Sequence, residues 1–226
     1  MKIALCLHGY FDSRMDLTSK GSDGYQHIKK NILDKADVDV HIHNWQPDLE
    51  KSIRELYKPV NAVFEPQVDF EPIVDSLGLP HMPGDSPMGR SPATILSHFY
   101  SIQECFKLVD FSKYDLVIKA RFDLGRINRN TSGPGKHNPY PVQCINFMPN
   151  CDPNRLHMAD WQHFEDGPAD MWFYAGPDIM KNFTTLYDDV SKNLNKDNVN
   201  AIRQLKWWMM HRGIWNKKLP LQTEWE

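Results

Sequence analysis

Residues 2–7, KIALCL, form a nearly continuous apolar run, and this run constrains the fold more than any other stretch of the chain. Such a run is typical of a strand that is buried on both faces, as the central strands of parallel sheets are. His8 and Gly9 end the run and predict a loop. The sequence therefore predicts a sheet with helices on both of its faces.

The following segment continues this pattern. Tyr25, Ile28, Ile32 and Ala36 recur at helical spacing, which predicts a helix. VDVHIHNW, residues 38–45, then alternates apolar and polar positions, as a strand with one drier face does. The order strand, helix, strand indicates an α/β fold, with a mostly parallel, Rossmann-like sheet flanked by helices.

Later segments supply the remaining elements. Residues 58–92 are rich in proline and glycine and predict a long irregular excursion, either a functional loop or disorder. Ser91 and Pro92 predict the start of a helix, with Ser97 and Ser101 together on its polar side. YDLVIK is a predicted central strand. Further strands are predicted near residues 142–147 and at 170–176, and further helices at 177–194 and 197–211.

Length and composition limit the possible functions. A chain of 226 residues suffices for one α/β domain. Its formal charge of −3 gives no general attraction to nucleic acid or to an anionic membrane, and no stretch approaches the ~18 apolar residues of a membrane span. We expect a single cytoplasmic domain. The four cysteines lack CxxC spacing and are expected to be reduced thiols, with Cys144 and Cys151 as a disulfide or metal alternative.

Polar residues stand at the carboxyl ends of three predicted strands, in HGYFDSR, HNW and RFDLG. Ligands of open α/β sheets bind at that edge. Asp123 is placed there to meet a divalent cation that bridges the phosphates of a nucleotide. Arg121 points to the same side and pairs either with that carboxylate or with a phosphate oxygen. The spacing leaves open whether the two residues form a strand-end ion pair or a ligand site.

Six segments resemble, in order and spacing, the small GT-A-type glycosyltransferases of polysaccharide loci in bacteria and large viruses: KIALCLHGY, DVDVHIHNW, SHFYSIQECFKL, YDLVIKARFDL, DMWFYAGPDIM and LKWWMMHRG. The resemblance implies a nucleotide-sugar-binding half, residues 1–125, and an acceptor-side half, residues 126–226. The implied reaction transfers a sugar from a nucleoside-diphosphate sugar to a carbohydrate hydroxyl in polysaccharide biosynthesis.

The resemblance carries over to particular residues. Such enzymes place a DxD motif at the junction of the halves; here Asp123 matches the second acidic position and Arg121 stands in place of the first. Asp123 would hold Mn²⁺ or Mg²⁺, and Arg121 would itself neutralise diphosphate charge. For two of the other implied residues, Trp45 and Tyr100, core packing is the alternative. The other nucleotide-side residues that it implies are His8, Gly9, Tyr10, Arg14, Asn44, Trp45, Ser97, Tyr100 and Ser101.

The acceptor side is implied to begin at Asp170, which precedes the apolar run MWFYAG. In an inverting enzyme a carboxylate at this place takes the proton of the acceptor hydroxyl. Glu165 and Asp166 compete for the role. His211, on the last predicted helix, is implied as a late metal or phosphate ligand, although a helix C-terminus also favours histidine through its dipole.

Two other functions are compatible with the residues. A non-catalytic nucleotide- or carbohydrate-binding module would keep the fold without the first acidic residue. His157, Asp160 and His163 would share a helix face and could bind a transition metal for hydrolysis, although Gly167-Pro168 argues against a helix there. The alternating histidines of VDVHIHNW are interpreted as residues of the strand surface.

Overall fold

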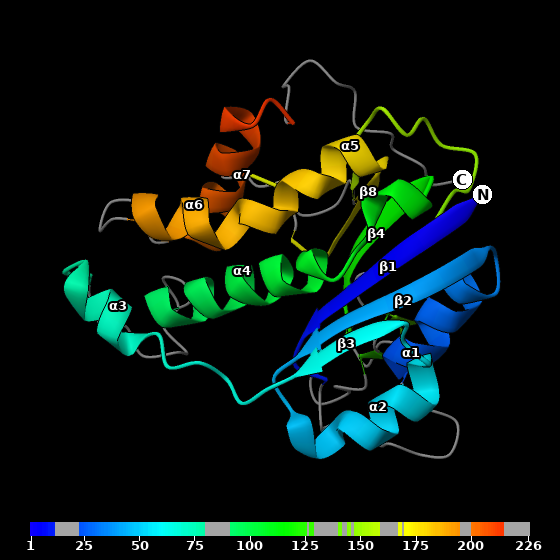
Figure 1. The fold of residues 1–226 in the computed structure, drawn as a ribbon, viewed down its shortest axis with the longest axis horizontal. Coiled ribbons are helices and arrows are strands. Elements are labelled where there is room, and N and C mark those ends of the chain that lie inside the picture. The colour runs from blue at the N-terminus through cyan, green and yellow to red at the C-terminus, as the bar shows by residue number, and fades with distance from the viewer. Residues whose placement is uncertain are drawn as a thin grey trace, which may run out of the picture.

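The protein has one six-stranded sheet with helices on both faces (Figure 1). The strand order is β3-β2-β1-β4-β8-β7. The computed structural model describes residues 1–11, 23–79, 91–125, 127–128, 140–141, 144–145, 147–158, 167–168, 170–194 and 200–214. The strands of the sheet are β1 (Lys2–Gly9), β2 (Asp37–Asn44), β3 (Asn61–Phe64), β4 (Leu116–Arg121), β7 (His157–Met158) and β8 (Trp172–Ala175).

Strand order reverses at β1. From β1 the chain proceeds to β2 and β3 on one side and then returns to place β4 on the other, with all four strands parallel. Strand β8 is antiparallel to β4, and β7 is antiparallel to β8. Because of its direction, β8 begins at the edge where the parallel strands end, so residues just before β8 lie beside the carboxyl end of β4.

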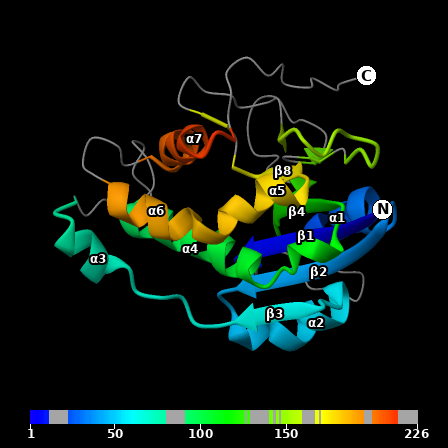
Figure 2. The same ribbon diagram turned by 45° about the horizontal axis from the view of Figure 1, so that its top comes forward.

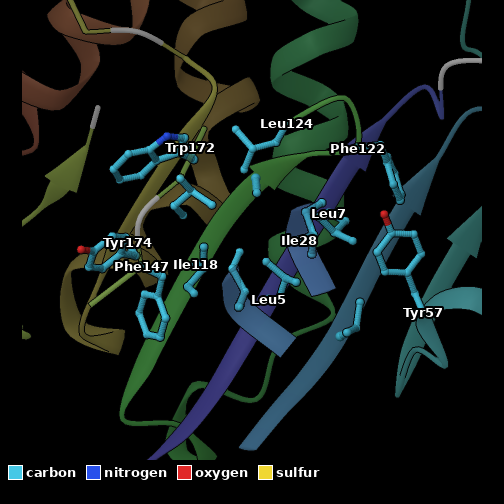
Figure 3. Close-up of a cluster of buried hydrophobic side chains, with 14 of the residues drawn as sticks. Leu5, Leu7, Ile28, Tyr57, Ile118, Phe122, Leu124, Phe147, Trp172 and Tyr174 are labelled. Atoms are coloured by element: carbon cyan, nitrogen blue, oxygen red, sulfur yellow. The ribbon is translucent and has the colours of Figure 1, made fainter. Parts of the chain in front are cut away.

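Two helical segments cover the first face of the sheet. α1 (Asp23–Ile28) continues into a π-helix (Lys29–Leu33), and a 3₁₀ turn (Pro47–Leu49) leads into α2 (Glu50–Tyr57). Figure 3 shows the core on this face, where side chains of β1 and β4 meet Ile28 and Tyr57. Ile3, Leu5 and Leu7 of β1 all point into this core, which confirms the strand predicted from KIALCL.

Helix α4 and the carboxyl-terminal helices cover the second face (Figure 2). Ala4 and Cys6 of β1 pack here against Phe99 and Phe106 of α4. Ser91 caps α4 by accepting a hydrogen bond from Thr94 N, as its sequence predicts. The helical segments of this face are α4 (Pro92–Lys107), a 3₁₀ turn (Phe111–Lys113), α5 (Pro177–Met180), a 3₁₀ segment (Lys181–Thr185), α6 (Leu186–Asn193) and α7 (Ala201–His211).

Two predictions about the irregular regions were wrong. Within residues 58–92 the structure has β3 and α3 (Glu71–Ser76), because NAVF pairs with β2 and Val74 packs against Phe70 and Leu96. Near residues 142–147, the described residues 144–145 and 147 are not in a strand; the pairing lies instead between β5 (Ile127–Asn128) and β6 (Tyr140–Pro141). In both places contacts with a distant segment determine the structure, and local composition does not predict such contacts.

The interpretation of His41 and His43 as surface residues was also wrong, because both are buried. Helix α4 covers the face to which they point. Both faces of β2 are therefore buried, and the alternation in VDVHIHNW places apolar side chains on one face and polar side chains on the other. All four cysteines are free thiols. Among the described residues, the helices are all too short or too polar to cross a membrane.

Candidate functional site

The carboxyl ends of β1, β2 and β4 bring three polar side chains into one row. The register pairs His8 with His43 on one side and with Arg121 on the other. One pair back along the same face, Cys6 lies beside Lys119 of β4. Because β1 is the strand at which the order reverses, the His8–Arg121 pair stands at the topological switch point, where open α/β sheets bind ligands.

His8 is a buried imidazole that forms no hydrogen bond with any residue the structure describes. The residue is only 2% exposed, and neither ring nitrogen has a partner among the described residues. The ring packs edge-on against the ring of His98 from α4, with 5.2 Å between their centroids. Burial, and then the charges of Lys119 and its neighbours, hold the pKa of His8 well below its usual value. His8 is therefore a neutral imidazole at pH 7.

Asp170 reaches the same place from the residues that precede β8. His98 Nε2 lies 3.2 Å from Asp170 Oδ2, a distance typical of an ion pair, although the two groups are not well aligned for a hydrogen bond. Lys119 Nζ donates to the backbone oxygen of Asp170 and lies 5.0 Å from the centre of the Phe173 ring. Lys119 is completely buried. The start of β8 is thus tied to β4 and to α4.

The charges around Asp170 determine its ionisation. Burial alone would raise its pKa, but His98 and the cations Lys119 and Arg121 hold the pKa well below its usual value. Burial, opposed by Asp170 and assisted by the two cations, lowers the pKa of His98 to about 4. We conclude that Asp170 is ionised and His98 neutral at pH 7.

Arg121 and Asp123 form a two-pronged ion pair. Arg121 Nε donates to Asp123 Oδ1 at 2.9 Å, and Arg121 Nη2 donates to Asp123 Oδ2 at 2.7 Å. Burial opposes the charge of Arg121, but Asp123 and then Asp170 raise its pKa. Of the two alternatives that the spacing left open, the structure has the ion pair, and about a fifth of each side chain stays accessible, at 23% and 22%.

Asp123 in this arrangement is poorly suited to a divalent cation, because both of its oxygens accept from Arg121 and a metal would have to share them with the guanidinium or displace it. The described residues also contain no group of three or more His, Cys, Asp or Glu side chains that could hold a metal ion. We refer to the residues at this edge as the carboxyl-edge cluster: His8, His98, Lys119, Arg121, Asp123 and Asp170.

A second, fully hydrogen-bonded network lies beside the cluster. Gly9 N donates to Ser101 Oγ at 2.9 Å, and Ser101 Oγ is 2.8 Å from His43 Nδ1. His43 Nε2 lies 2.9 Å from Glu65 Oε1. Burial lowers the pKa of His43, so a neutral ring with its proton on Nε2 satisfies the whole network. Asn44 Nδ2 donates to Gly9 O, which fixes the loop after β1.

The predicted aromatic residues pack together at the same edge. Trp45 is 4% exposed and stacks on Tyr100, with 5.5 Å between the ring centroids. Tyr100 also contacts Phe70 and Tyr187. Core packing, the alternative for Trp45 and Tyr100, is therefore what the structure shows for their rings. Tyr10, by contrast, is half-exposed.

The hydroxyl of Tyr10 donates to Gln67. Gln67 Nε2 in turn donates to Ser97 Oγ at 3.0 Å. Ser97 and Ser101 lie on one side of α4, as predicted, but this side is buried against the edge of the sheet. Ser97 is therefore linked to the loop after β1 through Gln67.

Several predicted residues lie elsewhere. His211 is exposed at the end of α7 with its ring stacked on Trp207, and the structure shows no contact between it and Asp123. His157 lies in β7, not in a helix; its ring stacks on Tyr174, and its Nε2 is 2.9 Å from Asp152 O. The following residues lie outside the described part of the chain: Arg14, Asp160, His163, Glu165 and Asp166.

His98 and Lys119 were not among the predicted site residues. Lys119 had a signal in the sequence, because it is the only charge within the apolar run LVIKA. His98 lies three residues before Ser101 on α4, but the predicted polar side of the helix comprised Ser97 and Ser101 alone. Both became site residues because the structure places Asp170 between them.

No protein-family model matches the chain, and no curated protein matches it. Among solved structures, the chain is similar to mouse xyloside xylosyltransferase 1 in its apo form. The sequence identity is 11% and the TM-score 0.41, with 94% of this chain and 83% of that chain covered. At this identity and TM-score the likeness assigns no activity to this chain.

Proposed function

We propose that the chain is a glycosyltransferase that transfers a sugar from a nucleoside-diphosphate sugar to a hydroxyl of a carbohydrate acceptor. One observation supports this proposal most strongly. The switch point between β1 and β4 holds two cations, an ionised carboxylate and two neutral histidines within a few ångströms of one another. Buried charges are costly to keep, so a group of them at the ligand-binding edge points to a function.

The donor side of the proposal is built on Arg121. Two of its five N–H groups pair with Asp123, so a diphosphate would accept hydrogen bonds from the other three, and the accessible fraction of the side chain lets a ligand reach it. Lys119 adds a second positive charge from beneath. As the sugar leaves, negative charge develops on the diphosphate, and fixed cations at this position stabilise it. On the neighbouring strand, Gly9 has a φ of +91° and so sets the course of the loop that follows β1.

The metal is not part of this proposal. Asp123 would bind Mn²⁺ or Mg²⁺ only by sharing its oxygens with Arg121 or by displacing it, so the ion pair and the metal compete for the same oxygens. The acceptor side is Asp170, an ionised carboxylate whose side chain keeps 14% of its surface exposed. It would supply the negative charge needed when the acceptor hydroxyl loses its proton.

A non-catalytic nucleotide-sugar-binding module is the second candidate. It is favoured by the closed ion pair, because no described carboxylate at the end of β4 is then available for catalysis through a metal. The two candidates differ in turnover: both bind nucleotide sugars, but only the transferase releases the nucleotide.

The proposal is tested with UDP-glucose, UDP-galactose, UDP-N-acetylglucosamine, UDP-xylose and GDP-mannose, each with and without Mn²⁺. Binding is measured by calorimetry and turnover by release of UDP or GDP. Arg121→Gln should weaken binding of the best donor about 10- to 100-fold, as expected for loss of a charged hydrogen bond. Arg54→Gln removes an exposed arginine on α2 and is the matched control.

Three results would count against the transferase. Absence of binding to every donor rejects both candidates. Binding without nucleotide release in the presence of simple methyl glycosides favours the binding module. Equal weakening by the Arg121 and Arg54 variants would place the ligand elsewhere than the carboxyl-edge cluster.

A further inference from the structure

We propose that His98 takes the proton of the acceptor hydroxyl, with Asp170 as the partner that orients its ring. The inference rests on the proposed function and refines its acceptor side, where the sequence alone predicts that Asp170 acts directly. It begins from the position of the His98 ring between Asp170 and His8.

The negative charge of Asp170 favours one tautomer of His98. Asp170 Oδ2 is 3.2 Å from Nε2, so an ionised carboxylate favours the proton on that nitrogen. A neutral ring with its proton on Nε2 has a lone pair on Nδ1. Nδ1 is therefore the atom of this pair that is able to accept a proton, and the positive ring that results is stabilised by the adjacent carboxylate.

Asp170 itself is a weaker candidate for direct proton transfer. His98, Lys119 and Arg121 all stabilise its ionised form, so its affinity for a proton is low. Its backbone oxygen and Oδ2 are also engaged, by Lys119 and His98. Accessibility does not favour it over His98, since the side chains are 14% and 10% exposed. An acceptor could reach either side chain. Asp170 stabilises the protonated imidazole of His98, whereas His98 stabilises the ionised form of Asp170, so the imidazole is the better proton acceptor of the two.

His8 completes the arrangement as a positioning residue. It is almost fully buried, and its ring supports the His98 ring edge-on from β1. Both of its nitrogens are buried and without a partner among the described residues, so a polar group of a ligand would reach them only after a neighbouring side chain had moved. An unpaired buried polar atom costs about 1–3 kcal/mol, which a purely structural ring at this position would not need to incur.

The groups that face His98 couple it to the donor side. They are His8 of β1, Lys119 and Arg121 of β4, and Asp170 before β8. Burial is the main reason that His98 is a poor base in the free protein, and the two cations add to it. A diphosphate bound at Arg121 offsets those cations. Donor binding should therefore raise the pKa of His98, so that the base becomes effective when the sugar is in place.

The step conserves atoms and charge as follows. The acceptor oxygen forms a bond to the anomeric carbon, and the bond from that carbon to the diphosphate oxygen breaks. The electron pair of the broken bond leaves with the diphosphate, next to Arg121. The acceptor proton moves to His98 Nδ1 and later returns to solvent. Attack from the side opposite the leaving group inverts the anomeric configuration.

The decisive variant is His98→Gln, assayed by nucleotide release with the donor that binds best. We expect kcat to fall about 100- to 1000-fold, as for loss of a general base. The Kd for the donor should stay within about threefold, because Arg121 and Lys119 are unchanged. His157→Gln changes a buried histidine of β7 and is the matched control, with full activity expected.

Two further readouts separate proton transfer from a structural role. In the wild type, kcat/KM should fall at low pH as His98 becomes protonated, and this acid limb should disappear in His98→Gln. ¹⁵N NMR of the imidazoles should show His98 with its proton on Nε2, and its pKa should rise when UDP is added. Asp170→Asn should change the tautomer, and combined with His98→Gln it should lower kcat little further, because the two act as a unit.

Several outcomes would overturn the inference. These are a His98→Gln variant with undiminished kcat, an acid limb that persists in it, a proton on Nδ1, or a product with retained anomeric configuration. Failure of the proposed function looks different, because the wild-type protein would then neither bind nor consume any of the five donors. In that case the assigned role of His98 is rejected together with the reaction.

Discussion

Two groups of polar residues lie on the same face of the sheet, each around a buried histidine, and they differ in how many nitrogens of that histidine have partners. In what we call the amino-end cluster, Asn61 donates to His41 Nδ1 at 3.4 Å, and His41 Nε2 is 3.0 Å from Tyr114 Oη. Tyr114 then donates to Asp39, which also receives Lys2 Nζ at 2.9 Å. Every ring nitrogen of His41 is used.

The carboxyl-edge cluster lies at the other end of the same strands, and there neither nitrogen of His8 has a partner within the described part of the chain. Both histidines are buried and neutral, and both lie on strands of one sheet. Burial of polar groups is tolerated where they are hydrogen-bonded, which is the situation of the amino-end cluster. Unpaired atoms at a ligand-binding edge instead indicate a place that has been kept for a ligand. This contrast can be tested in three ways.

Acid should produce the largest effect, because it breaks both clusters. Burial lowers the pKa of His8, His41, His43 and His98 relative to about 6.5 in the unfolded chain. For a base with a lowered folded pKa, the stability is fully present above pH 6.5 and is lost as the pH falls towards the folded value. Each of the four histidines should remove up to about 1.4 kcal/mol per pH unit. Thermal melts between pH 7 and pH 4.5 measure this loss.

A Tm that stays level from pH 7 to pH 5 would contradict the assignment of these histidines as neutral. Measuring the same series in a His8→Phe variant sharpens the comparison. That variant should show a shallower decline, because one fewer buried group has to take up a proton on unfolding.

His41→Phe should produce the next largest effect. The substitution leaves the hydroxyl of Tyr114 and the amide of Asn61 without the ring nitrogens that they contact. Loss of these partners should lower the free energy of unfolding by about 1–3 kcal/mol. Urea denaturation at pH 7.5 measures the change. Nucleotide-sugar binding should be retained, because His41 lies outside the carboxyl-edge cluster.

His8→Phe should have the smallest effect on stability, although it is the same substitution in an adjacent strand. No hydrogen bond is lost, so the free energy of unfolding should stay within about 0.5 kcal/mol or increase. Nucleotide release should nevertheless fall strongly. If His8→Phe lowered stability as much as His41→Phe, the two histidines would contribute equally to folding, and the proposed difference between the two clusters would be rejected.

The sequence predicted the central part of the fold because its signals were local. KIALCL and LVIKA became β1 and β4, and Ser91-Pro92 marked the start of α4. The direction of β8 was beyond such signals, because the apolar run MWFYA fits a parallel and an antiparallel strand equally well. That direction brings Asp170 to the carboxyl edge, so the most informative contact of the site depended on tertiary structure.

The candidate site was predicted in part. His8, Arg121 and Asp123 meet at one edge, as the strand ends suggested, and Asp170, which the resemblance implied for the acceptor side, joins them there. The role of His98 was not predicted, since nothing in α4 records which carboxylate will face it. Trp45 illustrates the opposite case: the resemblance implied a binding residue, with core packing as the alternative, and its ring is packed in the core of the edge.

A crystal structure of the protein with its best nucleotide-sugar donor would show where the donor binds. We expect density for the diphosphate between the end of β1 at Gly9 and the guanidinium of Arg121, with the sugar next to His98 and Asp170. A depression of about 600 Å³ on the outside of α2, lined by residues that include Lys51 and Arg54, offers an alternative location. Density there, with the carboxyl-edge cluster unchanged, would contradict the account.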